Sequence, residues 1–233
     1  MPAMKTIGMI GGMSWESTVT YYQLLNRIVR EKLGGLHSAQ LLLWSFDFAE
    51  IESMQANGDW DAATQALCDA AISLEKGGAE CILICTNTMH KMAPQVRDAV
   101  DIPLLHIADA TAATIQATGC TNPLLLATRY TMEEDFYKGW LRDKHGINVT
   151  IPSSTDRDKV HDIIYSELCQ GIVSAESKQE YLDIVARANN LDSIIFGCTE
   201  VGLLVKETDF QVPCFDTTAL HAQAAVEFSL STD

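Results

Sequence analysis

The most constraining feature of this sequence is a regular alternation between short, continuously apolar runs and longer stretches with helical periodicity. The apolar runs occupy residues 5–12, 39–47, 81–86, 102–109, 123–128, 147–152, 193–198 and 212–216. Strands that are apolar on both faces belong to parallel sheets covered by helices on either side. The sequence therefore predicts an α/β fold of mainly parallel sheets flanked by helices.

Helical periodicity fills the segments between these runs. The expected helices span residues 15–33, 59–76, 89–100, 110–119 and 132–145, two helices within 156–190 broken near 171, a short one after 200, and a closing one from 217. The first should open at Ser14, and the second should stop at Gly77-Gly78, since glycine commonly follows the last helical residue.

The two halves of the chain resemble each other. "ILICTNT" precedes "IPLLHIADATAATI" in the first half, and "IIFGCTE" precedes "VPCFDTTALHAQAAV" in the second. We expect two pseudo-symmetric lobes, residues 1–117 and 118–216, with a closing helix over 217–233 that could pack back on the first and a site in the cleft between them. The other interpretation is that α/β units simply resemble one another.

Composition excludes several classes of function. Basic residues number 16 against 31 acidic ones, for a net charge of -15, so no basic patch is available for nucleic acid. No apolar run approaches the length of a membrane span, and the apolar stretch at the N-terminus is too short for a signal peptide. Seven cysteines without a C-x-x-C pair favour free thiols in a reducing cytoplasm over disulfides or structural zinc. Dinucleotide and P-loop fingerprints are absent, and we expect no metal and no cofactor.

Polar side chains gather where the expected strands end and helices begin, which is where parallel sheets bind ligands. Cys198 follows one such strand, and a thiol beside a helix N-terminus should have a lowered pKa. The alternative for Cys198 is a packed core cysteine. Cys85 precedes Thr86 by one residue, so strand alternation directs it to the opposite side, and we assign it to the core.

Four short motifs at the ends of the expected strands together resemble the aspartate/glutamate racemase family. They are "GGMSWES", "CTNTMH", "TRYTME" and "GCTE", and the resemblance extends from residue 5 to the last helix. It implies inversion of the α-carbon of an acidic amino acid without pyridoxal phosphate, in a homodimer. Most members carry a cysteine at both catalytic positions, whereas this chain has Thr86 at the first and Cys198 at the second.

This departure predicts an asymmetric mechanism. A threonine hydroxyl is too weak an acid to stand as an alkoxide at neutral pH, so it cannot mirror a thiolate base. We therefore expect Cys198 to take the α-proton and Thr86 to donate or relay the returning proton. The enzyme should then prefer one enantiomer as its substrate.

The resemblance also suggests which residues contact the substrate. The expected contacts are Met13, Ser14, Gln55, Asn87, Thr88, Thr128, Thr131, Lys159, Thr199 and Glu200. Gln55 or Lys159 would bind the side-chain carboxylate, because the arginine common in aspartate racemases is missing after the second strand. Lys159 could equally be a solvated surface lysine, and Glu200 could cap its own helix.

Two other functions stay open at this point. A single cysteine also fits a decarboxylase of the same superfamily, which protonates an enediolate. The missing first cysteine also fits a protein that binds an acidic amino acid without turning it over.

Overall fold

The computed structural model describes residues 4–232. Their contacts divide the chain into two compact units. The first comprises the residues up to His106 together with those from His221 onward, and the second comprises Ile107–Leu220. The sequence predicted a boundary between residues 117 and 118, at the C-terminal end of the helix Ile107–Thr118. The observed boundary lies before this helix, between His106 and Ile107.

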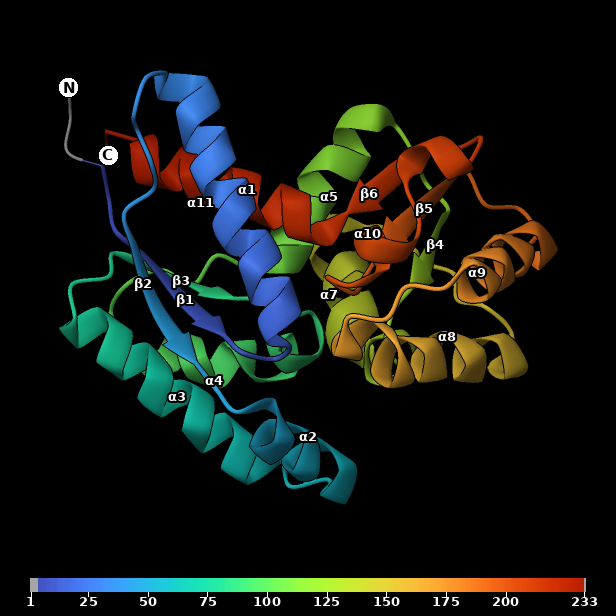
Figure 1. Ribbon diagram of the computed structural model, residues 1–233, viewed down its shortest axis with the longest axis horizontal. Coiled ribbons are helices and arrows are strands. Elements are labelled where there is room, and N and C mark those ends of the chain that lie inside the picture. Colours follow the sequence, from blue (N-terminus) through green and yellow to red (C-terminus); the bar gives the residue numbers. More distant parts are fainter. Residues whose placement is uncertain (1–3, 233) are drawn as a thin grey trace. The chain divides into compact units, whose positions relative to one another are not determined.

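The first unit is built on three parallel strands in the order β2-β1-β3 (Figure 1). Its elements are β1 (Ile7–Gly11), α1 (Trp15–Leu33), β2 (Leu41–Ser45), α2 (Phe48–Asn57), α3 (Trp60–Lys76), β3 (Cys81–Ile84), the 3-10 helix η1 (Thr88–Met92), α4 (Ala93–Asp98) and most of α11 (Thr217–Leu230). The predicted start of α1 is confirmed, because the Ser14 side chain accepts a hydrogen bond from the Ser17 N–H. The predicted stop at Gly77 is confirmed as well.

Strand alternation distributes the apolar residues of this sheet between two cores. Met9, Leu83 and Cys85 belong to the cluster that contains residues of α1 and α11, which confirms Cys85 as a core residue. Ile82 and Ile84 belong to the cluster formed with α2, α3 and α4. The sheet is therefore the middle of three layers.

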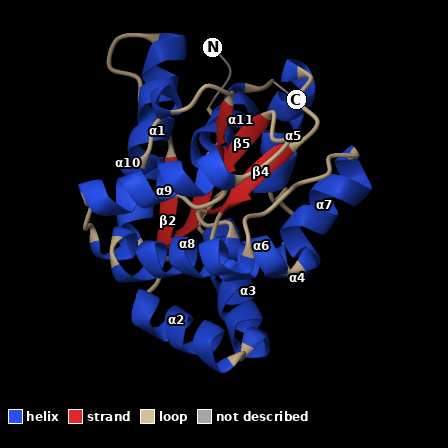
Figure 2. Ribbon diagram, turned by 90° about the vertical axis from the view of Figure 1, so that its right-hand side faces the viewer, coloured by secondary structure: helices blue, strands red, loops and turns tan. Residues whose placement is uncertain are grey.

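The second unit is also built on three parallel strands, in the order β4-β5-β6. Its elements are α5 (Ile107–Thr118), β4 (Pro123–Leu126), α6 (Arg129–Glu133), α7 (Asp135–His145), α8 (Ser154–Ser166), the 3-10 helix η2 (Leu168–Gln170), α9 (Ala175–Arg187), β5 (Ser193–Phe196), α10 (Val201–Leu204), the 3-10 helix η3 (Glu207–Asp209) and β6 (Cys214–Asp216). One apolar cluster joins the strands to these helices. Figure 2 shows α8 and α9 on one side of β4 and β5.

Several predicted elements differ from those observed. The strands expected at 102–109 and 147–152 are reduced to single bridges, Ile82 with Leu104 and Leu124 with Thr150. In the first case α5 already begins at Ile107, so too few extended residues remain for a strand.

The helices differ from the predictions in three places. The helix expected at 89–100 divides into η1 and α4, where Pro94 occupies the first turn of the new helix. The one expected at 132–145 divides at Glu134, whose backbone is extended. Helix α2 was not predicted, although Asp47 caps its start and Gly58 ends it in the left-handed conformation.

The two units share one strand order, which supports the internal repeat seen in the sequence. This order is complete once the single bridges are included, because Leu104 lies beside β3 in the first unit and Thr150 lies beside β4 in the second, which gives β2-β1-β3-Leu104 and Thr150-β4-β5-β6. The Ile82 N–H donates to the Pro103 carbonyl and the Ile194 N–H donates to the Pro213 carbonyl, both at 2.9 Å. Thr86 and Cys198 therefore occupy equivalent positions in their respective units.

No helix within residues 4–232 is both long enough and apolar enough to cross a lipid bilayer.

The turn after β1 provides a test of backbone crowding in the first unit. Gly12 has φ +82, and a Cβ there would lie 2.3 Å from the Phe46 carbonyl oxygen. Gly58 has φ +71 but open space around it. We expect Gly12→Ala to lower the free energy of unfolding by about 3 kcal/mol, and Gly58→Ala by only about 1 kcal/mol, in urea denaturation. Equal losses at the two positions would contradict the close approach of residue 46.

Candidate active site

The carboxyl ends of β3 and β5 carry the two residues expected to act on the substrate. The last ladder hydrogen bonds run from the Cys85 N–H to the Ile10 carbonyl at 2.9 Å and from the Gly197 N–H to the Leu126 carbonyl at 2.8 Å. The next residues are Thr86 in the first unit and Cys198 in the second. Each is therefore the first residue released from the sheet at its own strand end.

The Cys198 thiol is hydrogen-bonded to a buried carboxylate. Its Sγ–H donates to Glu200 Oε2 at 2.9 Å, and the Thr199 hydroxyl donates to the same oxygen at 2.6 Å. The Cys169 thiol, from η2, lies 3.8 Å from the other oxygen, Oε1. Glu200 does not cap α10 with its side chain, so the capping role considered from the sequence is wrong. Its carboxylate instead accepts hydrogen bonds from the residues around the thiol.

The predicted lowering of the Cys198 pKa is wrong for this structure. Cys198 is 8% exposed, and burial followed by the charge of Glu200 and the proximity of Cys169 raises its pKa well above the ordinary thiol value. Helix α10 has only four residues, so the dipole expected to favour a thiolate is short. In the absence of a ligand Cys198 is a protonated thiol at neutral pH.

Thr86 is the most accessible residue of its segment. It is half-buried, whereas residues 81–85 and 87–90 are all buried. Asn87 and Thr88, two predicted substrate contacts, follow it directly and are buried. Gln55, a third, is buried on α2 and its amide nitrogen lies 3.1 Å from the sulfur of Met89. The structure therefore brings Gln55 to the segment that follows Thr86.

The two opening loops contain matching pairs of hydroxyl groups. Ser14 caps α1 and lies 3.4 Å from the Ser17 hydroxyl, while Thr128 caps α6 and lies 3.2 Å from the Thr131 hydroxyl. All four residues are buried, as is Met13 beside Ser14. Capping accounts for part of the hydrogen bonding of Ser14 and Thr128, and Thr131 supplies the backbone N–H that Thr128 caps.

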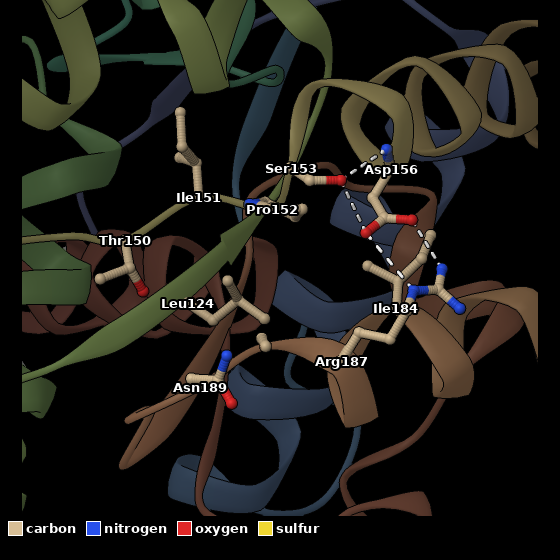
Figure 3. Close-up of a pocket in the computed structure, with 10 residues that line it drawn as sticks. Leu124, Thr150, Ile151, Pro152, Ser153, Asp156, Ile184, Arg187 and Asn189 are labelled. Carbon is tan, nitrogen blue, oxygen red and sulfur yellow. Dashed lines mark hydrogen bonds and ion pairs between the residues drawn. The ribbon is translucent and has the colours of Figure 1, made fainter.

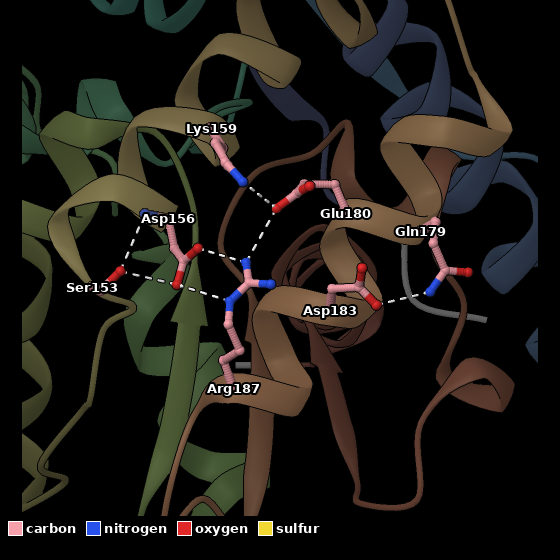
Figure 4. A network of polar contacts seen from close by, with 7 residues as sticks. All are labelled: Ser153, Asp156, Lys159, Gln179, Glu180, Asp183 and Arg187. Carbon is pink, nitrogen blue, oxygen red and sulfur yellow. Dashed lines mark hydrogen bonds and ion pairs between the residues drawn. The ribbon is translucent and has the colours of Figure 1, made fainter.

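Lys159 lies in an ion-pair network on the helices of the second unit (Figure 4). Its ammonium group is 2.8 Å from Glu180 of α9, which also binds Arg187. The preceding residue, Asp158, pairs instead with Arg129 at 3.0 Å. Successive residues of a helix point in different directions. Helix α8 therefore directs Lys159 toward α9, whereas Asp158 points toward Arg129 at the end of β4.

The structure identifies neighbours of the candidate residues that the sequence did not single out. Arg129, directly after Thr128, is a cation at the carboxyl end of β4. Cys169 and the buried Tyr181 lie near Cys198, and the pKa of Tyr181 is raised first by burial and then by the nearby ionisable groups of Cys198 and Glu200. Arg129 was recognisable from its place in the strand-end motif. Cys169 and Tyr181 are distant in sequence, so no local pattern could have indicated them.

A separate hollow of about 390 Å³ opens in the second unit (Figure 3). It is lined by Leu124 near the start of β4 and by Asn189, which precedes β5, so it lies at the amino end of this sheet. Asp156 and Arg187 form an ion pair of 2.6 Å at its edge. Cys198 follows the opposite, carboxyl end of the strands, and the hollow is thus not the site of the predicted chemistry.

Comparison with known proteins assigns the chain to a class of enzymes. Residues 10–225 match the family model described as Asp/Glu/Hydantoin racemase. The chain belongs to this family, whose racemases are isomerases.

Several relatives show how the family is represented. A Yersinia pestis protein with an unproven assignment as an Asp/Glu racemase is 54% identical, with a TM-score of 0.90 over 98% of this chain and 100% of that one. An aspartate racemase homologue from Pyrococcus horikoshii OT3 is 32% identical, with a TM-score of 0.85 over 98% and 100%. The broad specificity amino-acid racemase RacX of Bacillus subtilis is 21% identical over 74% of this chain and 75% of its own. The predicted α/β fold with two lobes is confirmed by these likenesses.

The contact between Cys198 and Glu200 predicts how the thiol responds to pH. Glu200→Gln removes a negative charge that disfavours the thiolate, so the pKa of Cys198 should fall and ionisation should begin at lower pH. We expect the midpoint of iodoacetamide alkylation, followed at the Cys198 peptide by mass spectrometry, to move to lower pH.

Glu176→Gln is the matched control, because Glu176 is exposed on α9. It should leave the alkylation midpoint unchanged. An unchanged midpoint in the Glu200→Gln protein would show that Glu200 does not govern the ionisation of Cys198.

Proposed function

We propose that this protein racemises aspartate or glutamate without a cofactor, with Cys198 as the group that takes the α-proton and Thr86 as the group that returns one. The observation that carries the proposal is the hydrogen bond of 2.9 Å from the Cys198 thiol to Glu200, at the carboxyl end of β5. Membership of a racemase family supports the reaction type. The acidic substrate is supported by the similarity to the aspartate racemase homologue of Pyrococcus horikoshii and by membership of the Asp/Glu/Hydantoin racemase family.

Glu200 is the proton acceptor that this mechanism requires. A protonated thiol cannot act as a base, and an added thiolate beside the Glu200 carboxylate is disfavoured. Transfer of the thiol proton to Glu200 Oε2 produces a thiolate and a neutral carboxyl group, so the buried site retains a single negative charge. The thiolate then removes the α-proton of the substrate.

Thr86 makes the reaction asymmetric. Its hydroxyl can donate a proton directly or through water while it takes a replacement proton from water, so that no alkoxide accumulates, but it is too weak an acid to become a base at neutral pH. Abstraction is therefore efficient only from the enantiomer whose α-proton is directed to Cys198. This mechanism requires Thr86 and Cys198 to act on the same substrate molecule.

Substrate binding is assigned to the polar groups at the strand ends. We propose that Asn87, Thr88 and Thr199 bind the α-carboxylate and ammonium groups. Ser14, Met13, Thr128 and Thr131 form the loops around them. The Gln55 amide is the proposed partner of the side-chain carboxylate. Lys159 is the less favoured partner, because its ammonium group is already paired with Glu180. An amide constrains side-chain length less than a bidentate arginine does, so both aspartate and glutamate are candidates.

Loss of the thiol should abolish proton exchange. We expect Cys198→Ala to reduce α-proton exchange in heavy water by about 1,000-fold or more for L- and D-aspartate and glutamate, measured by NMR. Thr86→Ala should retain exchange of one enantiomer but lose most of the inversion, measured by chiral chromatography. Exchange that persists in the Cys198→Ala protein would assign the base to another residue.

Thr86→Cys is the complementary variant. It should extend exchange to the second enantiomer, because a cysteine at this position can ionise to a thiolate, which can act as a base. Equal exchange of both enantiomers by the unmodified protein would contradict the asymmetric mechanism. Release of carbon dioxide from a malonate-type acid would indicate a decarboxylase, and binding without exchange would indicate a binding protein.

We further propose that the protein works as a cytoplasmic homodimer through the exposed face of α1. Trp15, Val19 and Tyr22 follow helical spacing along this face and are 64%, 43% and 56% exposed. We expect the double variant Val19→Glu and Tyr22→Glu to elute as a monomer in size-exclusion chromatography with light scattering. Ile172→Glu with Val173→Glu, which alters exposed residues of the second unit, is the control and should remain dimeric. A wild-type monomer would refute the proposal.

A further inference from the structure

The carbonyl group of Thr86 is held by a side chain. His90 Nδ1 lies 2.8 Å from the Thr86 oxygen. At the equivalent position of the second unit, the Cys198 carbonyl accepts a backbone hydrogen bond of 3.1 Å from the Val201 N–H. The carbonyl groups that follow the two strands therefore have different hydrogen-bond donors. Thr86 is held by the ionisable side chain of His90, and Cys198 is held by a backbone N–H.

The hydrogen bonds define the proton positions on two buried histidines. A carbonyl oxygen can only accept, so His90 carries its proton on Nδ1. His221 donates from Nε2 to the Leu105 carbonyl at 2.7 Å, which leaves its Nδ1 to accept from the Tyr21 hydroxyl at 2.8 Å. Burial lowers the pKa of His90 to about 3 and that of His221 to about 4, so both rings are neutral at neutral pH.

The His90 ring is enclosed by other aromatic side chains of the first unit. The centre of the His106 ring lies 4.6 Å away, and that of His221 lies 5.7 Å away. Tyr21 of α1 packs edge-on against His221 of α11. His90 is 2% exposed, so its burial against the nearer His106 ring restricts rotation of its own ring and with it the direction of the Nδ1–H group.

The backbone of Thr86 is consequently fixed from both sides. The Cys85 N–H before it is bonded to Ile10 in the sheet, and the Thr86 carbonyl after it is bonded to His90. The Thr86 side chain leaves the backbone between these two anchors.

We propose that His90 is a positioning residue for proton return. Its Nδ1–H group holds the Thr86 carbonyl and so fixes the backbone that presents the Thr86 hydroxyl. This inference rests on the proposed function, in which Thr86 returns the proton to the substrate. Proton delivery by a hydroxyl depends steeply on distance and angle, whereas abstraction by Cys198 depends on a different unit of the chain.

Amide substitutions can separate this role from a purely structural one. Asparagine places an amide nitrogen close to the position of Nδ1 of histidine, and glutamine places one close to that of Nε2. His90→Asn therefore preserves a donor to the Thr86 carbonyl, whereas His90→Gln removes it. At His221 glutamine preserves the donor and asparagine removes it, because that ring donates from Nε2. His221→Asn is thus the matched control, which breaks a bond to Leu105 in the same cluster.

The readout is the ratio of inversion to exchange. Starting from the enantiomer that presents its α-proton to Cys198, NMR in heavy water measures exchange with retained configuration, and chiral chromatography measures inversion. We expect His90→Gln to lower inversion at least about tenfold while exchange stays within about twofold. His90→Asn should restore inversion to within about threefold of wild type. His221→Asn should lower the melting temperature without changing the ratio.

Three results would overturn the proposal. They are an unchanged ratio in His90→Gln, equal losses of inversion and exchange, or a failure of His90→Asn to restore inversion. If His90→Gln does not fold, nitrogen NMR of the wild-type imidazole decides the matter, because a proton on Nε2 in place of Nδ1 rules out the bond to Thr86. Failure of the proposed function itself would appear separately, as exchange that survives in Cys198→Ala.

Discussion

The last hydrogen bond of the parallel ladder in each unit fixes the residue that follows it. Gly197 donates to Leu126 at 2.8 Å and Cys85 donates to Ile10 at 2.9 Å, and both bonds lie at the carboxyl ends of buried strands. Beyond these bonds the chain must turn, and its polar groups need partners other than the sheet. Cys198 and Thr86 are the first residues in that position, so the sheet fixes the backbone up to the residue before each of them, and their side chains lie beyond the ladder.

The buried charge of Glu200 then determines what Cys198 can do. A thiol in contact with a carboxylate is a weak acid, yet the same carboxylate is the nearest acceptor for its proton. In the proposed mechanism, reactivity therefore depends on moving a proton between two hydrogen-bonded atoms and not on a permanent thiolate. The first unit has no carboxylate in the corresponding position, because Thr88 stands where the second unit has Glu200. The repeated strand order thus carries different side chains at equivalent positions.

Much of this architecture was predictable from the sequence, and the failures have physical causes. Continuous apolar runs indicated parallel strands, and Ser14 and Gly77 marked helix ends because capping is a local property. The segments at 102–109 and 147–152 have the composition of strands but form only single bridges. Composition does not reveal how many residues a neighbouring helix leaves for pairing.

The candidate site was predictable in its positions but not in its electrostatics. Cys198 and Thr86 were recognisable because each follows an apolar run. The raised pKa of Cys198 depends on burial, on the conformation of Glu200 and on Cys169 from another element. The contact of Gln55 with Met89 likewise joins residues on separate elements, and the sequence contains no signal for the direction of either side chain.

Burial of Cys198 also affects its durability. Peroxides and other oxidants attack thiolates, and a thiol that remains protonated and nearly enclosed reacts slowly with them. If Cys198 acts as proposed, its raised pKa also keeps the sulfur in the less reactive thiol form between turnovers. The burial that makes Cys198 a weak acid would thus also slow its irreversible oxidation.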